Sequence, residues 1–487
     1  MKETGILMPV FSLPSNTGVG ELGREAEKFI DILKDNGITI WQILPLNPAG
    51  FGNSPYQPYS SYAGDEIYIS LDKLYDMGLL DTKPCTFNDK ALKVDYPKVR
   101  EFKERYLKIA YETFIAKKLD ESVEYKNFIS NKWVYDYAVF RALKEKNNLK
   151  CWNEWEDEDK NWPSIRRELD DNLKEVAGYH IFLQFIFDKQ WSDIKSKANE
   201  SGIKILGDVP FYVGVDSVDV WNRRDNFLLD KDGYPTFIAG VPPDYFSITG
   251  QRWGNPIYDW DKIKKDGFSF WIDRIGYSSK LFDIVRIDHF RAFDTFWKIP
   301  STCPTAVEGK WIEAPGYEVI DALNDNIDNL SLVAEDLGDL RPEVLALKDY
   351  YGLKGMKVLI FSLDTSRKQV MDTYKDKENM IIYTGTHDNS TLMEWYENQS
   401  IACKRKIRKF LKKSGFSNGS VKDRLIEYTL SSQAQYAIIP LADILGLKEE
   451  GHINTPGTVG EPNWQWKICD FDKTEKELKR YKKYIRR

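Results

Sequence analysis

Short apolar runs that end in polar or glycine-rich segments recur along the chain, and helical patterns separate most of them. The clearest run, at 281–285, stops at a group of charged residues that includes Arg286 and Asp288. A strand that is buried on both faces, as in a parallel sheet, has this pattern. Seven further runs predict strands, at 5–10, 38–44, 203–210, 330–334, 356–361, 380–384 and 437–441.

The first two runs enclose a helical pattern. Between 24 and 36 the apolar residues Ala26, Phe29, Ile30 and Leu33 have helical spacing, and Gly37 follows as a stop signal. A strand–helix–strand unit implies a parallel sheet, and eight such strands predict an α/β fold of the (β/α)8 TIM-barrel type. A doubly wound sheet is the alternative, but no GxGxxG follows the first run and no P-loop lysine motif occurs.

Two long segments do not fit the repeating unit. The segment 71–175 is helical and heavily charged, whereas 211–275 lacks regular periodicity and contains many turn dipeptides. We therefore expect one catalytic barrel over 1–487 with a helical and a loop-rich insertion, and without a C-terminal β-sandwich. The aromatic-rich stretch 240–256 is a candidate lid, because disordered surface segments are usually poor in aromatic residues.

The charge and the cysteines exclude several classes of protein. The net charge is −6, and the basic C-terminal tail is too short to indicate nucleic-acid binding. Five scattered cysteines without CxxC spacing argue against a disulfide framework and a zinc site. No apolar segment is long enough for a signal peptide or a membrane span, so we expect a cytoplasmic protein without a membrane partner.

Aromatic residues make up 14% of the chain, and many lie in loop-like stretches. Core packing accounts for most of them. Aromatic rings in loops also stack on the apolar faces of sugars or bases, and the lack of excess positive charge favours sugars.

Acidic residues and histidines gather at the ends of predicted strands. The four acids are Asp208, Asp288, Glu335 and Asp388, and the histidines are His289 and His387. In a barrel these strand ends surround one pocket. Hydrolysis or transfer of a glycosidic bond needs such carboxylates, one as a proton donor and one as a nucleophile or stabilising charge. A divalent-metal site of carboxylate ligands is the rival interpretation.

Six segments together resemble one known family. VRIDHFRAF, VAEDLG, TGTHDN, GDVPFYV, NSPYQPYS and GVPPDYFSITGQRWGNP are similar to motifs of the 4-α-glucanotransferase family, also called amylomaltase or disproportionating enzyme. That family is a branch of the α-amylase clan. The similarity runs in order from about Gly5 to the C-terminal NTPGT and NWQWK, and so covers nearly the whole chain.

The resemblance implies a role for each matching residue. Asp288 would be the nucleophile, Glu335 the general acid/base and Asp388 the transition-state stabiliser, while Arg286 would keep Asp288 ionised. The remaining residues would bind substrate: Tyr56, Asp208, Arg286, His289, His387, Asn389, Asp244, Tyr245, Phe246, Trp253 and Asn255. No cofactor and no metal are implied.

The expected function is therefore a retaining transferase that moves α-1,4-glucan segments between maltooligosaccharides or amylose and releases glucose from small donors. The lid would exclude water, so that a sugar hydroxyl resolves the covalent intermediate. A glucan hydrolase of the same clan is the alternative. A non-catalytic glucan-binding protein would lack one of the three acids, and all three are present. The oligomeric state stays open.

Overall fold

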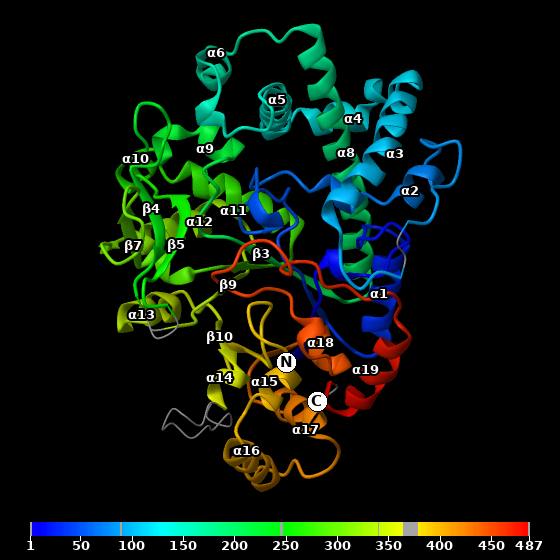
Figure 1. The fold of residues 1–487 in the computed structure, drawn as a ribbon, viewed down its shortest axis with the longest axis vertical. Helices are drawn as coiled ribbons and strands as arrows, with labels where there is room; N and C mark the ends of the chain where they lie inside the picture. Colours follow the sequence, from blue (N-terminus) through cyan, green and yellow to red (C-terminus); the bar gives the residue numbers. More distant parts are fainter. Residues whose placement is uncertain (1, 88–89, 244–246, 339, 364–377, 486–487) are drawn as a thin grey trace.

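An eight-stranded parallel sheet closes nearly into a barrel at the centre of the molecule (Figure 1). The computed structural model describes residues 2–87, 90–243, 247–338, 340–363 and 378–485. Its strands, in spatial order, are β10 (Gly355–Val358), β11 (Met380–Tyr383), β12 (Tyr436–Pro440), β1 (Glu3–Leu7), β2 (Ile40–Gln42), β3 (Lys204–Val209), β6 (Ile284–Ile287) and β9 (Leu332–Ala334). The parallel bridge between Val333 and Lys354 brings β9 to the segment just before β10. The predicted barrel is confirmed.

Helices surround this barrel because each presents an apolar face to it. In α1 (Arg24–Asp35) the predicted residues Ala26, Phe29, Ile30 and Leu33 are buried. The helix ends before Gly37, which has a φ of +77° that glycine adopts without strain. The other long barrel helices are α8 (Asp171–Glu200), α11 (Ser269–Leu281), α12 (Gly316–Asn326), α13 (Pro342–Tyr350), α16 (Ile401–Lys413), α17 (Val421–Leu430) and α19 (Asp472–Ile485).

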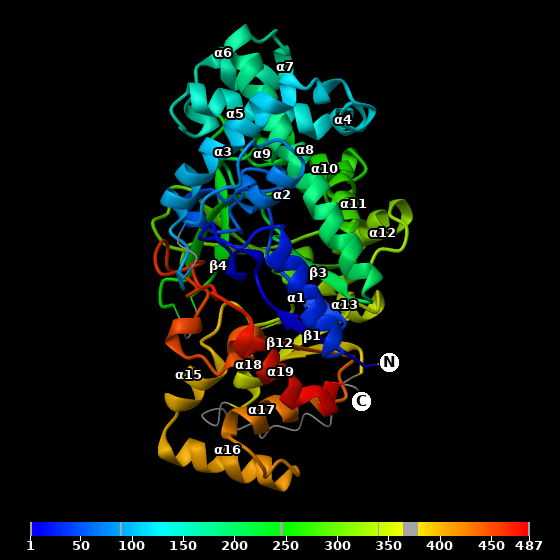
Figure 2. The same ribbon diagram turned by 90° about the vertical axis from the view of Figure 1, so that its right-hand side faces the viewer.

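The chain between β2 and β3 contains the helical segment expected from the sequence. It includes α2 (Leu71–Asp76), α3 (Tyr96–Ala116), α4 (Val123–Ile129), α5 (Lys132–Lys146), α6 (Asp157–Lys160) and α7 (Trp162–Ile165). Both side views place α4 to α7 together at the end of the molecule that is remote from the C-terminal helices (Figures 1 and 2). Buried Tyr137 and Phe140 on α5 contribute to the core of this segment.

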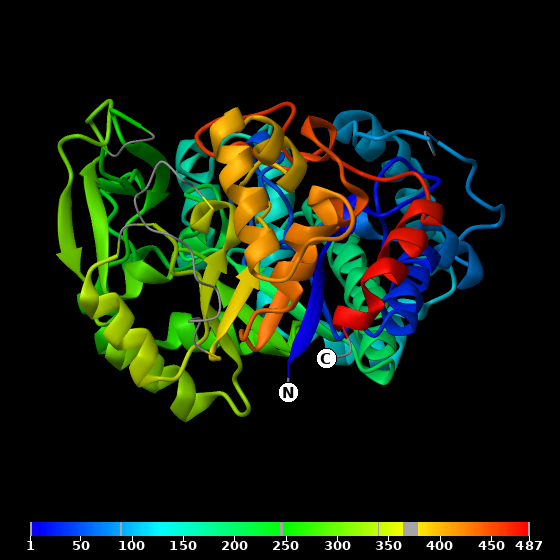
Figure 3. The same ribbon diagram turned by 90° about the horizontal axis from the view of Figure 1, so that it is seen from below.

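The segment 211–275 holds more regular structure than the sequence predicted. Its strands β4 (Phe237–Val241) and β5 (Gln251–Pro256) join β7 (Thr295–Pro300) and β8 (Lys310–Glu313) in an antiparallel sheet of order β5-β4-β7-β8. Figure 3 shows this sheet at one side of the barrel. Glycines and prolines in β4 and β5 interrupt the alternation by which a half-buried strand is predicted. The expected lid is thus part of a β-hairpin.

The described residues after β12 form helices and loops, and α19 is the last element. This agrees with the expected absence of a C-terminal β-sandwich. Within the described ranges, no helix has the length and apolar character needed to cross a membrane.

Candidate active site

The predicted acids lie at the carboxyl ends of barrel strands. Asp208 is the penultimate residue of β3, Asp288 follows β6 directly, and Glu335 follows β9 directly. The main-chain ladder continues past the strands, because Asp288 N donates to Val209 O at 3.0 Å and Glu335 N donates to Ile287 O at 3.0 Å. The strand order β3-β6-β9 therefore holds these three carboxylates side by side at one rim of the barrel.

Arg286 joins two of the acids. It lies two residues before Asp288 on the same face of β6, as the alternation of a strand requires. Its Nη1 atom is 2.5 and 2.7 Å from the two oxygens of Asp208 and 3.0 Å from Oδ1 of Asp288. One buried guanidinium thus serves two carboxylates.

The protonation of this cluster differs from the sequence expectation. Burial raises the pKa of Asp288 to about 8, and Asp208 and Glu335 add to the rise, although the Arg286 guanidinium opposes it. Burial also raises the pKa of Glu335, against the lowering effect of Arg286 and two main-chain N–H groups. Arg286 therefore favours the ionised nucleophile but does not outweigh burial. The free site consequently retains a proton on its carboxyl groups up to neutral pH.

Main-chain N–H groups fix the carboxylate of Glu335. His289 N donates to Oε2 at 2.8 Å, and Leu337 N donates to Oε1 at 2.9 Å. His289 reaches this geometry with a φ of +53°, a left-handed conformation that is uncommon outside glycine. The residue next to the expected nucleophile thereby positions the expected acid, which the sequence did not reveal.

Tyr56 connects the acids to a histidine. Its hydroxyl lies 2.7 Å from Oδ2 of Asp208 and 2.8 Å from Nε2 of His387, and its ring stacks on His387 with 5.3 Å between centroids. Burial raises the pKa of Tyr56 well above its ordinary value and lowers that of His387. The tyrosine is therefore neutral, and its hydroxyl donates a hydrogen bond to Asp208.

Asp388 comes from the loop after β11 and is held from a distant part of the chain. Asn454 Nδ2 donates to Oδ1 of Asp388 at 2.7 Å, while Asn454 N donates to His387 O at 3.1 Å. The Asp388 side chain remains 41% exposed, so it can still accept hydrogen bonds from a ligand. The sequence motif NTPGT contains Asn454, but the motif alone did not indicate this contact.

Two amide residues predicted to bind substrate form hydrogen bonds with neighbouring loops in this structure. Asn389 Oδ1 accepts from Thr386 N at 2.9 Å and from Thr386 Oγ1 at 3.0 Å. Asn255 is buried; its Nδ2 donates to Val213 O at 2.8 Å, and its Oδ1 accepts from Gln57 Nε2 at 3.0 Å. Asn389 Oδ1 and the amide of Asn255 thus have partners within the protein, and the substrate-binding role of both residues stays a prediction.

The β4–β5 hairpin reaches the acids through Trp253. The indole of Trp253 meets His289 edge-on with 4.8 Å between ring centroids, and burial lowers the pKa of His289 to about 3. Gln57, from the loop after β2, also donates to Trp253 O at 3.3 Å. The two long loops therefore meet beside the candidate catalytic acids. Asp244, Tyr245 and Phe246 lie outside the described residues.

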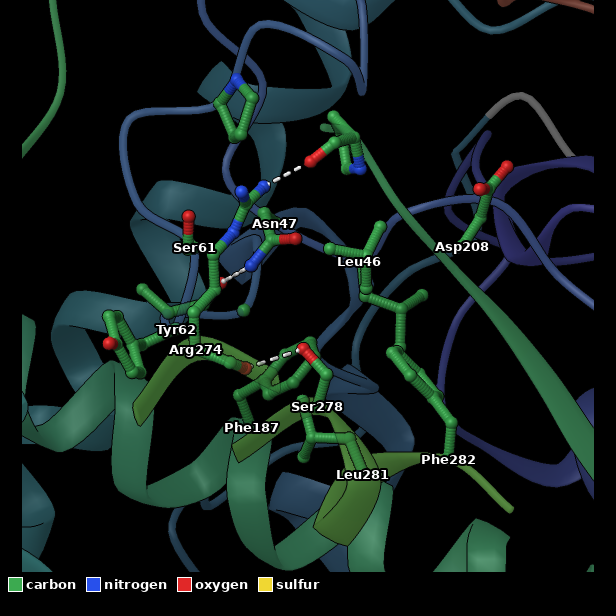
Figure 4. Close-up of a pocket in the computed structure, with 15 residues that line it drawn as sticks. Leu46, Asn47, Ser61, Tyr62, Phe187, Asp208, Arg274, Ser278, Leu281 and Phe282 are labelled. Atoms are coloured by element: carbon green, nitrogen blue, oxygen red, sulfur yellow. Dashed lines mark hydrogen bonds between the residues drawn. The ribbon is translucent and has the colours of Figure 1, made fainter. Parts of the chain in front are cut away.

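A small cavity of about 20 Å³ lies between the loop after β2 and α11 (Figure 4). Of the four acids only Asp208 lines it, and Arg274 extends across it to donate to the carbonyl oxygen of Pro210. The volume accommodates about one water molecule and excludes a sugar ring. The side chains that line this cavity, Arg274 among them, therefore support the end of β3. In the described residues, no group of three or more His, Cys, Asp or Glu side chains is placed to hold a metal ion.

Known proteins resemble this chain over its whole length. A family model described as 4-alpha-glucanotransferase matches residues 8–472. A 4-alpha-glucanotransferase of Synechocystis is 43% identical over 477 residues (95% of this chain, 93% of the relative), and one of Thermus thermophilus is 40% identical over 473 residues (95% and 94%). The solved structure of the amylomaltase from Streptococcus agalactiae in complex with acarbose superposes with a TM-score of 0.92 at 35% identity, covering 100% of both chains.

Proposed function

Because this chain belongs to the 4-alpha-glucanotransferase family, we propose that Asp288, Glu335 and Asp388 transfer α-1,4-glucan segments by a retaining, two-step reaction. The observation that carries this assignment is the link between the two central acids. His289, the residue after Asp288, donates its main-chain N–H to Glu335 Oε2 at 2.8 Å. The carboxylate of Glu335 is therefore held against the main chain that carries Asp288, which suits a nucleophile and its acid/base partner.

In the first step, Asp288 attacks the anomeric carbon of the donor and Glu335 protonates the departing glycosidic oxygen. A covalent bond forms between the Asp288 carboxylate and the sugar while the glycosidic bond breaks, and the leaving chain takes the proton of Glu335. Burial raises the pKa of Glu335, which favours the protonated carboxyl group that this step consumes.

In the second step, Glu335 takes the proton from a hydroxyl of the acceptor glucan. The acceptor oxygen attacks the anomeric carbon, and the bond to Asp288 breaks. Two inversions restore the α configuration, and Glu335 is protonated again. Arg286 stabilises the Asp288 carboxylate as it leaves, since its Nη1 lies 3.0 Å from Oδ1.

Asp388 would hold hydroxyl groups of the reacting sugar as the ring distorts. Its carboxylate is partly exposed, and Asn454 holds it from behind at 2.7 Å. Hydrogen bonds to the ring hydroxyls that strengthen in the transition state lower the barrier by several kcal/mol in such enzymes. Tyr56, stacked on His387, offers its ring to the same sugar.

Transfer requires that a sugar hydroxyl, and not water, reaches the intermediate. Trp253 and His289 bring the hairpin against the acids, and Gln57 ties its base to the loop after β2. We propose that residues 240–256 exclude water there. The roles of Asp244, Tyr245 and Phe246 remain predictions, as does a cytoplasmic location. Hydrolysis is the second candidate, and the names of the full-length relatives favour transfer.

Incubation with maltotriose tests this proposal. Chain lengths and total reducing ends are followed together, with Asp288→Asn as the inactive control. Transfer yields glucose and a ladder of longer maltooligosaccharides at nearly constant reducing ends. Rising reducing ends with only shorter products would show hydrolysis, and an unchanged substrate would contradict the assignment of the acids.

A further inference from the structure

We propose a second binding site for α-1,4-glucan chains, remote from the catalytic acids, on a tyrosine patch formed by Tyr317 of α12 and by Tyr350 and Tyr351 at the end of α13. Tyr317 is 45% exposed and Tyr350 is 71% exposed, so both rings present a large part of their surface to solvent. The inference rests on the proposed function for the identity of the glucan, and it adds a site that catalysis does not require.

The three rings form one continuous surface. Ring centroids are 4.9 Å apart for Tyr350 and Tyr351, 5.5 Å for Tyr317 and Tyr350, and 6.0 Å for Tyr317 and Tyr351. Tyr351 is anchored, because its hydroxyl donates to Asp321 Oδ1 at 2.7 Å and lies 2.9 Å from Tyr317 O. The patch is thus organised before any ligand arrives, which lowers the entropic cost of binding.

The chemistry of the patch suits a sugar polymer. Aromatic rings stack on the apolar faces of glucose units, and tyrosine adds a hydroxyl that bonds sugar hydroxyls. The hydroxyl groups of Tyr317 and Tyr350 have no hydrogen-bond partner among the described residues. The rings meet at interplanar angles of 45° to 84°, so the surface is faceted. In a curved glucan chain, successive glucose units are rotated relative to one another, so such a chain contacts a faceted surface better than a flat chain does.

The position of the patch connects it to the active site. Helices α12 and α13 lie next to each other on the flank of the barrel (Figures 1 and 2). They precede and follow β9, the strand that ends at Glu335. Arg341, which begins α13, forms an ion pair with Asp294 in the segment after the nucleophile. The same sector of the barrel therefore carries both the acid/base and the patch.

A further partly exposed ring lies in the chain segment between Asp288 and Tyr317. Trp311 on β8, the strand that leads into α12, is 39% exposed and packs under the guanidinium of Arg291 at 4.0 Å from its ring centroid. Arg291 itself follows Asp288 in the same short segment. Binding at a second site raises the local concentration of chain ends at the acids.

The test compares two double variants. Tyr317→Ala/Tyr350→Ala removes the exposed rings of the patch and leaves the anchored Tyr351. Tyr135→Ala/Tyr234→Ala is the matched control, because both of its tyrosines are 46% exposed and lie outside the patch. Retention in native gels that contain amylose is measured in an inactive Asp288→Asn background, so that the glucan is not consumed.

We expect the patch variant to bind amylose about five- to tenfold more weakly than its parent, in line with the loss of two stacking contacts. The control should be retained like the parent. In the active enzyme, the same patch substitutions should raise KM for amylose severalfold and leave kcat and KM for maltotriose unchanged.

Equal retention of the patch variant and its parent would overturn the proposal. A changed oligomeric state in size-exclusion chromatography without a change in retention would also overturn it, and would show that a second copy of the chain covers the rings. If the unsubstituted protein did not transfer glucan units from maltotriose, the proposed function itself would be contradicted. The two failures are therefore distinguishable.

Discussion

The hydroxyl of Tyr56 donates a hydrogen bond of 2.7 Å to Oδ2 of Asp208, and this bond determines which ring nitrogen of the neighbouring His387 carries the proton. Because the only proton of Tyr56 points to Asp208, its oxygen must accept from His387 Nε2 at 2.8 Å. Burial lowers the pKa of His387, so the neutral ring carries its proton on Nε2. Its Nδ1 has no hydrogen-bond partner among the described residues.

Tyr56→Phe tests this network. The substitution keeps the stacked ring but removes the donor to Asp208 and the acceptor for His387. We expect kcat/KM for maltotriose to fall about 10- to 100-fold, a loss of about 1.4–2.7 kcal/mol in transition-state stabilisation. The thermal midpoint should change little, because one hydrogen bond contributes about 1 kcal/mol. A variant with unchanged kcat/KM would show that the hydroxyl has no part in catalysis.

Arg286→Lys should be severely impaired although it keeps the charge. Arg286 reaches both Asp208 and Asp288 with its Nη1 atom, and the shorter lysine side chain does not extend its ammonium to that position. Without this contact the pKa of Asp288 rises further. The nucleophile is then protonated at higher pH, so the acidic limb of the pH–rate profile should move to higher pH and kcat should fall about 100-fold. A pH–rate profile in which kcat falls but the acidic limb stays at the same pH would contradict the electrostatic role of Arg286.

Asp288→Asn should stabilise the folded protein while it abolishes transfer. The folded pKa of about 8 lies far above the unfolded value of about 3.9. The folded state therefore binds more protons between these values, so the stability from this carboxyl is present below about pH 4 and is lost as pH rises through 8. The asparagine side chain of Asp288→Asn does not titrate, so it adds no such pH dependence to the stability.

We expect the gain of Asp288→Asn to grow from near zero at pH 4 to about 1–3 kcal/mol at pH 8. This is less than the full shift in pKa implies, because the carboxylate is 29% exposed to solvent. Thermal midpoints of variant and parent at both pH values give the comparison. A constant difference across this range would show that Asp288 is not destabilised by its surroundings.

Glu335→Gln separates the two halves of the reaction. The variant lacks the proton for the leaving oxygen, so we expect kcat with maltotriose to fall at least about 1000-fold. A maltosyl fluoride donor, whose leaving group needs no protonation, should still form the covalent intermediate with Asp288. Mass spectrometry of the intact protein detects that adduct. Equal losses with both donors would assign the proton to another residue.

The sequence predicted the barrel because its strands are buried on both faces, and continuous apolar runs such as 203–210 stand out from the helices. It predicted the acids because Asp208 lies at the end of its strand, and Asp288 and Glu335 follow theirs directly. The hairpin β4–β5 escaped prediction, since Gly240 and Gly254 interrupt its alternation and its pairing is stabilised by a third strand, β7.

The sequence patterns also did not predict the contacts between segments that are distant along the chain. The left-handed conformation of His289 and the bond from Asn454 to Asp388 depend on tertiary packing that no local pattern records. The same holds for Gln57, which ties the hairpin to the loop after β2. Local patterns identify which residues carry the chemistry, whereas the fold determines which residues hold them in place.

Asn454→Asp provides the sharpest test of such a positioning residue. The substitution is nearly isosteric, but it replaces the amide that donates to Asp388 with a carboxylate at the same distance of 2.7 Å. Two negative charges this close repel each other, so the pair should take up a proton at neutral pH. Asp388 would then lose its fixed position or its charge.

We expect Asn454→Asp to lower kcat about 100-fold at pH 8 and less at pH 5.5, where a shared proton restores a hydrogen bond between the two carboxyl groups. Asn454→Ala is the control: it removes the donor without adding charge, so its loss, about 10-fold, should not depend on pH in this range. Stopped assays with maltotriose at both pH values measure the ratio. If both variants lost activity equally at both pH values, Asn454 would act through the packing of its loop and not through the carboxylate of Asp388.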